Sequence, residues 1–215
     1  MRVTGQEPAV AGVVAIIRLR EHQPADALLD ALVAAGVDAI EVTLPTPGSL
    51  EAVRRWVAKT SMTVGVGTVR TPTEAARAID AGAQFLVTPT TVPQVVESAT
   101  ARAVPTVCGA LTPTEIDTAW QLGATAVKVF PVATAGGPAY VRSIQEPLDD
   151  VRLLPTGGVT VESTREYARL GCTGVGVGSA LASEALVAGQ QWTELSERAA
   201  EFVTAWEEGQ KDRHR

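Results

Sequence analysis

The sequence predicts an α/β fold, a single (β/α)8 barrel, on three observations. Eight short apolar segments suit buried strands, and helical patterns rich in Ala, Leu, Val, Glu and Arg separate them. The segments recur every 21 to 26 residues, which indicates a repeated βα unit. Eight such units in 215 residues approach the minimum size of this barrel. The candidate strands begin near Val13, Ala39, Met62, Gln84, Pro105, Ala126, Arg152 and Gly174.

Each candidate strand is a continuous apolar run, which is typical of parallel strands that helices cover on both faces. A doubly wound open sheet is the alternative fold. Such a sheet usually has a glycine-rich turn after its first strand, and residues 18–24 contain no glycine. The sequence therefore favours a TIM barrel.

The predicted helices have clear start and stop signals. Thr71 and Thr112 each begin a Thr-Pro-Thr-Glu capping box, in which threonine caps the helix and glutamate reaches back three residues later. A glycine, which adopts the left-handed conformation without steric cost, follows four of the helical patterns. These glycines are Gly36, Gly82, Gly123 and Gly171.

The length and composition fit one domain over residues 1–215, with frayed ends at about 1–8 and 210–215 and a closing helix over 191–209. A net charge of −6 and few aromatic residues argue against a nucleic-acid partner. The apolar run at 9–17 is too short to span a bilayer and lacks a signal-peptide cleavage pattern. The sequence therefore predicts a cytoplasmic protein without a membrane segment.

Lys128 stands out because it lies in the middle of the apolar run AVKVFP. Burying an ammonium costs several kcal/mol unless it is paired or loses its proton. The other two lysines, Lys59 and Lys211, lie in polar surroundings. We therefore expect the fold to hold Lys128 where its amine can react.

Further polar residues fall at the strand ends that form the active-site mouth of such a barrel. Glu41 and Thr43 share one face of their strand, and Lys128 shares a face with Phe130. Other strands end in Arg18, Thr68, Thr88-Pro89 and Thr156. A structural ion pair would also explain the buried charges, and backbone hydrogen bonding would also explain Thr43, Thr68 and Thr88. Their common location at one mouth favours function.

The last two strands end in Gly157-Gly158 and Gly178-Ser179, which is where barrels of this kind bind phosphate. Glycines let backbone N–H groups close around an anion, and a helix N-terminus adds partial positive charge. The sequence thus predicts an anion pocket beside the buried amine.

A buried lysine, a carboxylate and an anion pocket predict Schiff-base chemistry, in which the amine attacks a ketone. The only histidines are His22, in the first turn, and His214, in the tail, so histidine metal sites and histidine acid–base catalysis are not expected. Cys108 and Cys172 have no metal-type spacing. We expect neither a metal nor a cofactor.

The strings IEVTL, GVGTV, TPTT, AVKVFP, LLPTGGV and GVGSAL, in this order, resemble the 2-keto-3-deoxy-6-phosphogluconate aldolase family, which includes 4-hydroxy-2-oxoglutarate aldolase. The resemblance covers about residues 13–192. It implies a homotrimeric class I aldolase that splits a phosphorylated keto-deoxy sugar acid into pyruvate and glyceraldehyde 3-phosphate.

The resemblance also implies residue roles. Lys128 would form the Schiff base and Glu41 would shuttle protons. Thr68 would lie near the substrate carboxylate, and the other matched positions would contact the sugar chain and its phosphate. These positions are Phe130, Thr156 and Pro89 for the chain, and Gly157, Gly158, Gly178 and Ser179 for the phosphate.

One position departs from the gluconate members, which carry an arginine where this chain has Pro45. The string VAIIR is similar to the phosphogalactonate branch, so we assign the carboxylate to Arg18. Alternatives are the same chemistry on the galactonate epimer or on 4-hydroxy-2-oxoglutarate, a phosphosugar isomerase or epimerase, and a non-catalytic barrel that binds a phosphate ligand.

Overall fold

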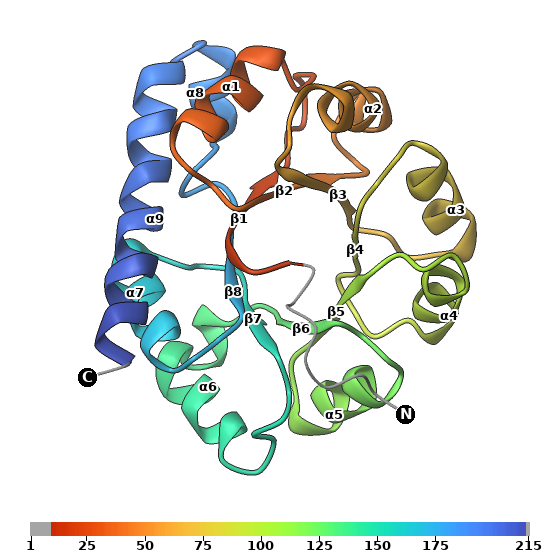
Figure 1. The fold of residues 1–215 in the computed structure, drawn as a ribbon, viewed down its shortest axis with the longest axis vertical. Coiled ribbons are helices and arrows are strands. Elements are labelled where there is room, and N and C mark those ends of the chain that lie inside the picture. The colour runs from red at the N-terminus through yellow and green to blue at the C-terminus, as the bar shows by residue number, and fades with distance from the viewer. Residues whose placement is uncertain (1–9, 214–215) are drawn as a thin grey trace.

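Strands form at all eight predicted positions in the computed structural model, which describes residues 10–213 (Figure 1). All neighbouring strands are parallel, and the predicted starts lie within two residues of the observed ones. The strands are β1 (Gly12–Ile17), β2 (Ala39–Thr43), β3 (Thr63–Gly67), β4 (Leu86–Val87), β5 (Thr106–Ala110), β6 (Ala126–Val129), β7 (Leu153–Pro155) and β8 (Gly174–Val177).

The sheet closes into a ring, as the barrel prediction requires. β1 pairs with β2 on one side and with β8 on the other. A bridge between Thr156 and Gly176 joins the end of β7 to β8. The strand order β7-β6-β5-β4-β3-β2-β1-β8 is thereby completed to a circle, so the open-sheet alternative is wrong.

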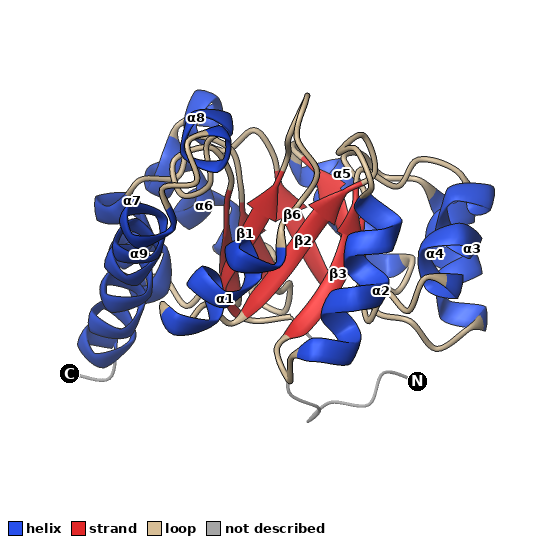
Figure 2. Cartoon of the chain, turned by 90° about the horizontal axis from the view of Figure 1, so that it is seen from above, coloured by secondary structure: helices blue, strands red, loops and turns tan. Residues whose placement is uncertain are grey.

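Helices surround the ring on its outside, as the side view shows (Figure 2). They are α1 (Asp26–Ala34), α2 (Ser49–Lys59), α3 (Pro72–Asp80), α4 (Pro93–Ala101), α5 (Pro113–Gln121), the 3-10 turn η1 (Ala133–Ala135), α6 (Gly137–Gln145), α7 (Val161–Arg169), α8 (Glu184–Ala188) and α9 (Trp192–Arg213). Each strand is thus covered from outside, which explains why the strands are continuous apolar runs.

The sequence signals at the helix ends are confirmed. Thr71 and Thr112 accept hydrogen bonds from the backbone N–H groups of Glu74 and Glu115, and both capping boxes are complete. The four glycines after helices have positive φ angles between 76° and 97°. A third capping box, from Thr160 to Ser163, begins α7 and does not follow the predicted Thr-Glu pattern.

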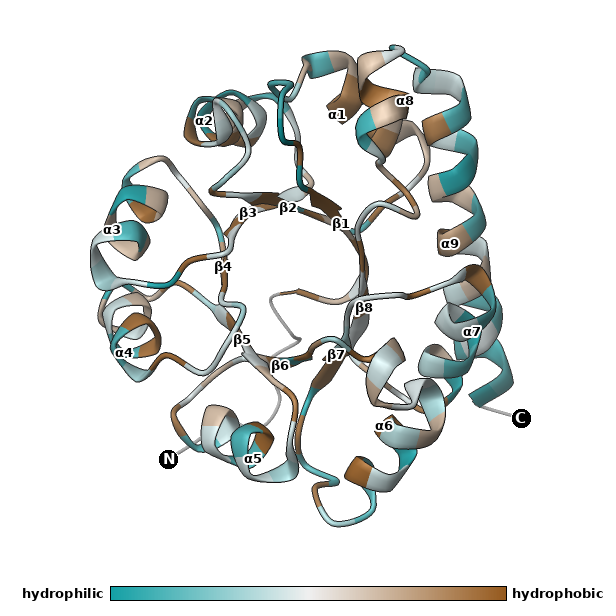
Figure 3. Cartoon of the chain, turned by 180° about the vertical axis from the view of Figure 1, so that it is seen from behind, coloured by the Kyte–Doolittle hydropathy of each residue, from teal (hydrophilic) through white to brown (hydrophobic). Residues whose placement is uncertain are grey.

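Apolar side chains fill both the layer between strands and helices and the lower interior of the ring. Figure 3 shows the hydrophobic colour on the strands and on the helix faces turned toward them. Inside the ring, Val14, Ala39 and Ala126 belong to one apolar cluster with Phe85 and others. Side chains two residues further along the strands point to the same interior. The next layer toward the strand ends therefore holds Ile16, Glu41 and Lys128.

The end of the chain differs from the prediction of a frayed tail from residue 210. α9 continues to Arg213, because its last turns are tied to α7. Asp212 accepts a hydrogen bond from Arg169 at 2.6 Å, and Glu208 pairs with Arg165. Gly209 lies so close to α7 that a Cβ there would be 2.3 Å from the carbonyl oxygen of Arg165. The rest of the frayed-end prediction, residues 1–8 and 214–215, lies outside the described residues.

Candidate active site

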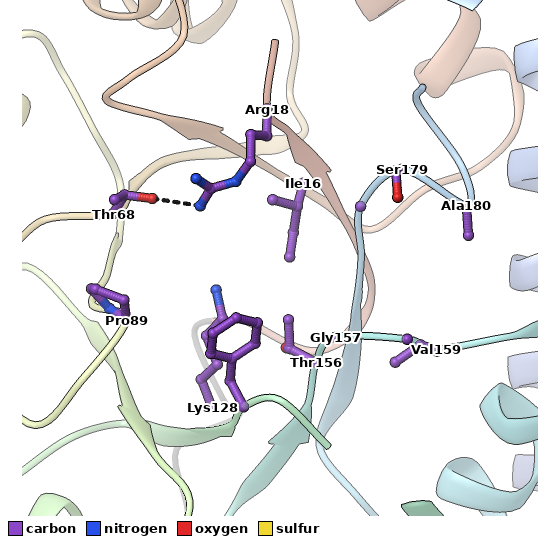
Figure 4. Close-up of a pocket in the computed structure, with 13 residues that line it drawn as sticks. Ile16, Arg18, Thr68, Pro89, Lys128, Thr156, Gly157, Val159, Ser179 and Ala180 are labelled. Atoms are coloured by element: carbon purple, nitrogen blue, oxygen red, sulfur yellow. Dashed lines mark hydrogen bonds between the residues drawn. The ribbon is translucent and has the colours of Figure 1, made fainter. Parts of the chain in front are cut away.

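A cavity of about 500 Å³ opens at the carboxyl ends of the strands (Figure 4). Ten of the eleven predicted site residues line it, although they come from strands β1, β3, β4, β6, β7 and β8 or the segments that follow them. They are Arg18, Thr68, Pro89, Lys128, Phe130, Thr156, Gly157, Gly158, Gly178 and Ser179. The eleventh, Glu41, is buried next to the amine of Lys128.

The lysine and the glutamate form a buried ion pair. Lys128 Nζ lies 3.6 Å from Glu41 Oε2, and their side chains are 8% and 3% exposed. β6 and β2 lie opposite each other in the ring of eight strands, so the two side chains meet across the barrel interior. The amine also lies 5.5 Å from the centre of the Phe130 ring, a favourable distance for a cation above an aromatic face.

Glu41 has space for its carboxylate because Gly67 has no side chain. A Cβ at Gly67 would lie 1.8 Å from Glu41 Oε1. This oxygen is buried and has no hydrogen-bond partner among residues 10–213. A buried carboxylate oxygen without a partner is costly, which is typical of a group kept for proton transfer.

Arg18 extends over the cavity from the end of β1, as Figure 4 shows. Its Nη2 donates a hydrogen bond of 2.9 Å to the hydroxyl of Thr68. Thr68 has a φ of 61°, a left-handed conformation that a β-branched residue seldom adopts. Such strain gathers at functional sites, where it holds a side chain in one orientation.

Two glycine-containing segments, which follow β7 and β8, also line the cavity. Gly157 and Gly158 have φ angles of 90° and 76°, so a side chain there would strain the backbone. A Cβ at Gly157 would also approach the ring of Phe130 to 3.0 Å. A Cβ at Gly178 would meet nothing within 4 Å. We infer that only the first pair requires glycine for its own conformation.

Other polar residues flagged by the sequence do not line the cavity. The hydroxyl of Thr43 lies 3.1 Å from that of Thr46, and the hydroxyl of Thr88 accepts a hydrogen bond from the N–H of Gly109. These two threonines serve neighbouring groups, which was the alternative interpretation. His22 Nδ1 lies 2.6 Å from a carboxylate oxygen of Glu184, away from Lys128.

Sequence reasoning missed three lining residues, Ile16, Val159 and Ala180. Each is a small or aliphatic residue in an apolar stretch, so no pattern distinguished it from the core. The period of two along β1 could have found Ile16, because it lies two positions before Arg18.

The described residues contain neither a candidate metal cluster nor a membrane-spanning helix. No three His, Cys, Asp or Glu side chains between residues 10 and 213 are grouped so that they could hold a metal ion. None of the described helices is both long and apolar enough to cross a membrane.

The family model described as KDPG and KHG aldolase matches residues 7–197. This match covers well over half of the 215 residues. The chain belongs to this aldolase family. Its members are class I, Schiff-base enzymes, so the isomerase and non-catalytic alternatives are set aside, and the chain is an aldehyde-lyase.

Two curated aldolases are similar to the chain. The 2-dehydro-3-deoxy-phosphogluconate aldolase of Pseudomonas aeruginosa is 35% identical over 163 residues, which are 75% of this chain and 73% of that protein. The 2-dehydro-3-deoxy-6-phosphogalactonate aldolase of Escherichia coli K12 is 34% identical over 201 residues, 91% of this chain and 95% of its own.

A solved KDPG aldolase also has this fold. The enzyme of Legionella pneumophila, with pyruvate captured as a covalent carbinolamine, is 25% identical and superimposes with a TM-score of 0.80. The alignment covers 89% of this chain and 94% of that one. A KDPG and KHG aldolase uses a lysine amine for its Schiff base. Among the described residues, Lys128 is the lysine that lines the cavity.

Proposed function

We propose that this aldolase reversibly cleaves 2-keto-3-deoxy-6-phosphogluconate to pyruvate and glyceraldehyde 3-phosphate. One observation carries the proposal: a buried lysine amine lies 3.6 Å from a buried carboxylate, beside a cavity that an arginine and two glycine-containing segments also line. The three features fit a keto carbon flanked by a carboxylate and a more distant phosphate.

The reaction would use Lys128 and Glu41 as follows. Lys128 Nζ, in its neutral form, attacks the keto carbon, and loss of water gives a protonated imine. The C4 hydroxyl loses its proton as the C3–C4 bond breaks, and the bond's electron pair moves into the imine to form an enamine. The aldehyde product leaves. Glu41 accepts the proton that leaves the C4 hydroxyl. It then returns a proton to C3 of the enamine, which becomes an imine again. Water then hydrolyses the imine and releases pyruvate.

Charged and polar groups at the cavity rim would hold the substrate. Arg18 and Thr68 would bind the carboxylate, since a guanidinium grips a carboxylate with two hydrogen bonds. Gly157, Gly158, Gly178 and Ser179 would bind the phosphate, and Phe130, Thr156 and Pro89 would contact the carbon chain. The lining of the cavity supports each of these roles.

The galactonate epimer is the second candidate substrate. Arg18 lines the cavity, as the similarity to the phosphogalactonate branch implies, whereas the exposed Pro45 lines a neighbouring hollow. The two epimers differ only at C4 and give the same products. Steady-state cleavage of both by one enzyme preparation tests the choice, because kcat/KM compares their transition states directly. A homotrimeric state and a cytoplasmic location stay predictions.

The test of the chemistry is reductive trapping. The protein is incubated with pyruvate and borohydride, and its intact mass and peptides are measured. We expect one pyruvyl-sized adduct, on Lys128. Lys128→Ala should lose it, whereas Lys59→Ala, which removes a surface lysine, should keep it. An adduct elsewhere, or none in the folded protein, would contradict the role of Lys128.

A further inference from the structure

Thr46 is a buried residue outside the cavity whose hydroxyl has unusual partners. It lies in the loop after β2 and is 2% exposed. Its Oγ1 accepts a hydrogen bond of 3.1 Å from the N–H of Leu19 and donates one of 3.2 Å to the carbonyl oxygen of Ile17. These are the two residues on either side of Arg18.

The hydrogen-bonding capacity of this hydroxyl is fully used. A hydroxyl has one hydrogen and two lone pairs. The hydrogen goes to Ile17, and the lone pairs accept from Leu19 and from the hydroxyl of Thr43, which lies 3.1 Å away. The N–H of Thr46 itself donates to the carbonyl of Thr43 at 2.9 Å. The loop after β2 is thus fixed both to its own strand and to the end of β1.

The strand ladder does not provide this support. The last residue pair of β1 and β2 is Ile17 with Val42, so the register ends before Arg18. The Thr46 hydroxyl connects the loop after β2 to the end of β1, beyond this last residue pair. Arg18 is thereby held at two points, through the backbone on both sides of its Cα and through its guanidinium, which donates to Thr68 at 2.9 Å.

We propose that Thr46 is the positioning residue of Arg18, and that it sets the affinity of the site for the carboxylate of pyruvate. The inference rests on the proposed role of Arg18. An arginine side chain has many rotamers, so fixing its Cα and backbone direction reduces the freedom lost when the guanidinium binds. The loop after β2 would thus support the carboxylate-binding arginine through the backbone on both sides of it.

A purely structural role predicts a different result. Losing a buried hydroxyl network lowers stability under either interpretation. Only the positioning role predicts a selective change in pyruvate binding that depends on the presence of Arg18.

The experiment measures exchange of the pyruvate methyl protons with deuterated water, which needs the Schiff base but no aldehyde. Thr46→Val keeps the shape and removes the hydrogen bonds. We expect its KM for pyruvate to rise about 10-fold with kcat within about twofold of wild type. Thr46→Ser keeps the hydroxyl and should retain the wild-type KM. In an Arg18→Ala background, which itself raises KM, Thr46→Val should add nothing.

Thr106→Val is the matched control. Thr106 is equally buried, at 3% exposure, and its hydroxyl has no hydrogen-bond partner among the described residues. This substitution should leave KM and kcat unchanged. If Thr46→Val does not fold, Thr46→Ala takes its place, with the same expectations.

Three results would overturn the inference. A wild-type KM in Thr46→Val beside a raised KM in Arg18→Ala would remove the positioning role alone and leave the proposed function intact. A further rise of KM when Thr46→Val is added to Arg18→Ala would show that Thr46 acts on the site by another route. An unchanged KM in Arg18→Ala would remove the carboxylate role of Arg18 and the inference with it, whereas reductive trapping on Lys128 tests the aldolase chemistry separately.

Discussion

Gly67 provides space for the catalytic carboxylate, since a Cβ there would lie 1.8 Å from Glu41 Oε1 and 2.4 Å from the carboxyl carbon. Gly67→Ala should therefore displace Glu41 from Lys128. We expect kcat to fall at least about 10-fold, because a shift of about 1 Å in a catalytic group can cost up to 100-fold. Proton exchange of pyruvate, corrected for the folded fraction, measures the loss.

Gly65→Ala is the control for this variant. Gly65 lies two residues earlier in β3, and a Cβ there would lie 2.5 Å from the ring of Phe85. Gly65 is the strand partner of Glu41, but a Cβ there would crowd the ring of Phe85 and not the carboxylate of Glu41. Both variants should lose stability, and only Gly67→Ala should lose activity per folded molecule. An equal loss in both would attribute the effect to the fold.

At this scale, the sequence revealed the residues that break a local pattern. Lys128 and Glu41 are charged in apolar strands, and Arg18 and Thr68 end such strands, so their polarity was informative. Val159 and Ala180 gave no signal, because an apolar wall and an apolar core have the same composition. Thr46 gave none either, since its partners beside Arg18, Ile17 and Leu19, lie in another part of the chain.

Among the elements, α9 shows how closely a helix can approach its neighbour. Gly209 packs against α7, where a Cβ would lie 2.3 Å from the carbonyl oxygen of Arg165 and 2.7 Å from Ala168 Cβ. Glycine to alanine usually stabilises a helix by about 1 kcal/mol. Here the clash should reverse the sign, and we expect Gly209→Ala to lower the unfolding free energy by about 1 to 3 kcal/mol.

Thermal unfolding measures this effect, and Glu201→Ala on an exposed position of the same helix is the control. The control should stay within about 0.5 kcal/mol of wild type. The KM for pyruvate should not change in either variant, because neither residue lines the cavity. A stabilised Gly209→Ala would mean that α7 and α9 can separate without cost.

The elements themselves were predictable because local signals agree with the fold. Glycines and capping boxes marked helix ends at several places. The end of α9 was not predictable from its charged sequence. Its last turns are stabilised by Arg165 and Arg169 of α7, which lie more than 40 residues earlier in the chain.

For the molecule as a whole, burial makes stability depend on alkaline pH, and Cys172 and Tyr167 show how. Burial raises the pKa of Cys172 from 9.0 to about 12. Burial, and to a smaller extent the nearby Cys172, raises the pKa of Tyr167 from 10.0 to about 12. Both groups are neutral in the folded state, whereas the unfolded chain loses these protons at lower pH. Their contribution is complete below about pH 9 and is lost as pH rises toward 12.

Cys172→Ala should flatten this dependence. Chemical unfolding at several pH values between 9 and 11 should show a smaller loss per pH unit than wild type, by at most about 1.4 kcal/mol for one group. Val175→Ala, a core truncation without a titrating group, should lower stability while keeping the wild-type slope. An unchanged slope in Cys172→Ala would assign the alkaline loss to other groups.

Because the site takes residues from both halves of the ring, the activity of this enzyme reports whether the barrel has closed. Glu41 belongs to β2 and Lys128 to β6, which lie four strands apart in either direction around the circle. The first four strands bring the base, the arginine and Thr68, and the last four bring the amine and the glycine-rich wall. A chain still emerging from the ribosome therefore has no competent site until its final strands join β1. In refolding experiments, the return of pyruvate exchange would time the joining of the two halves.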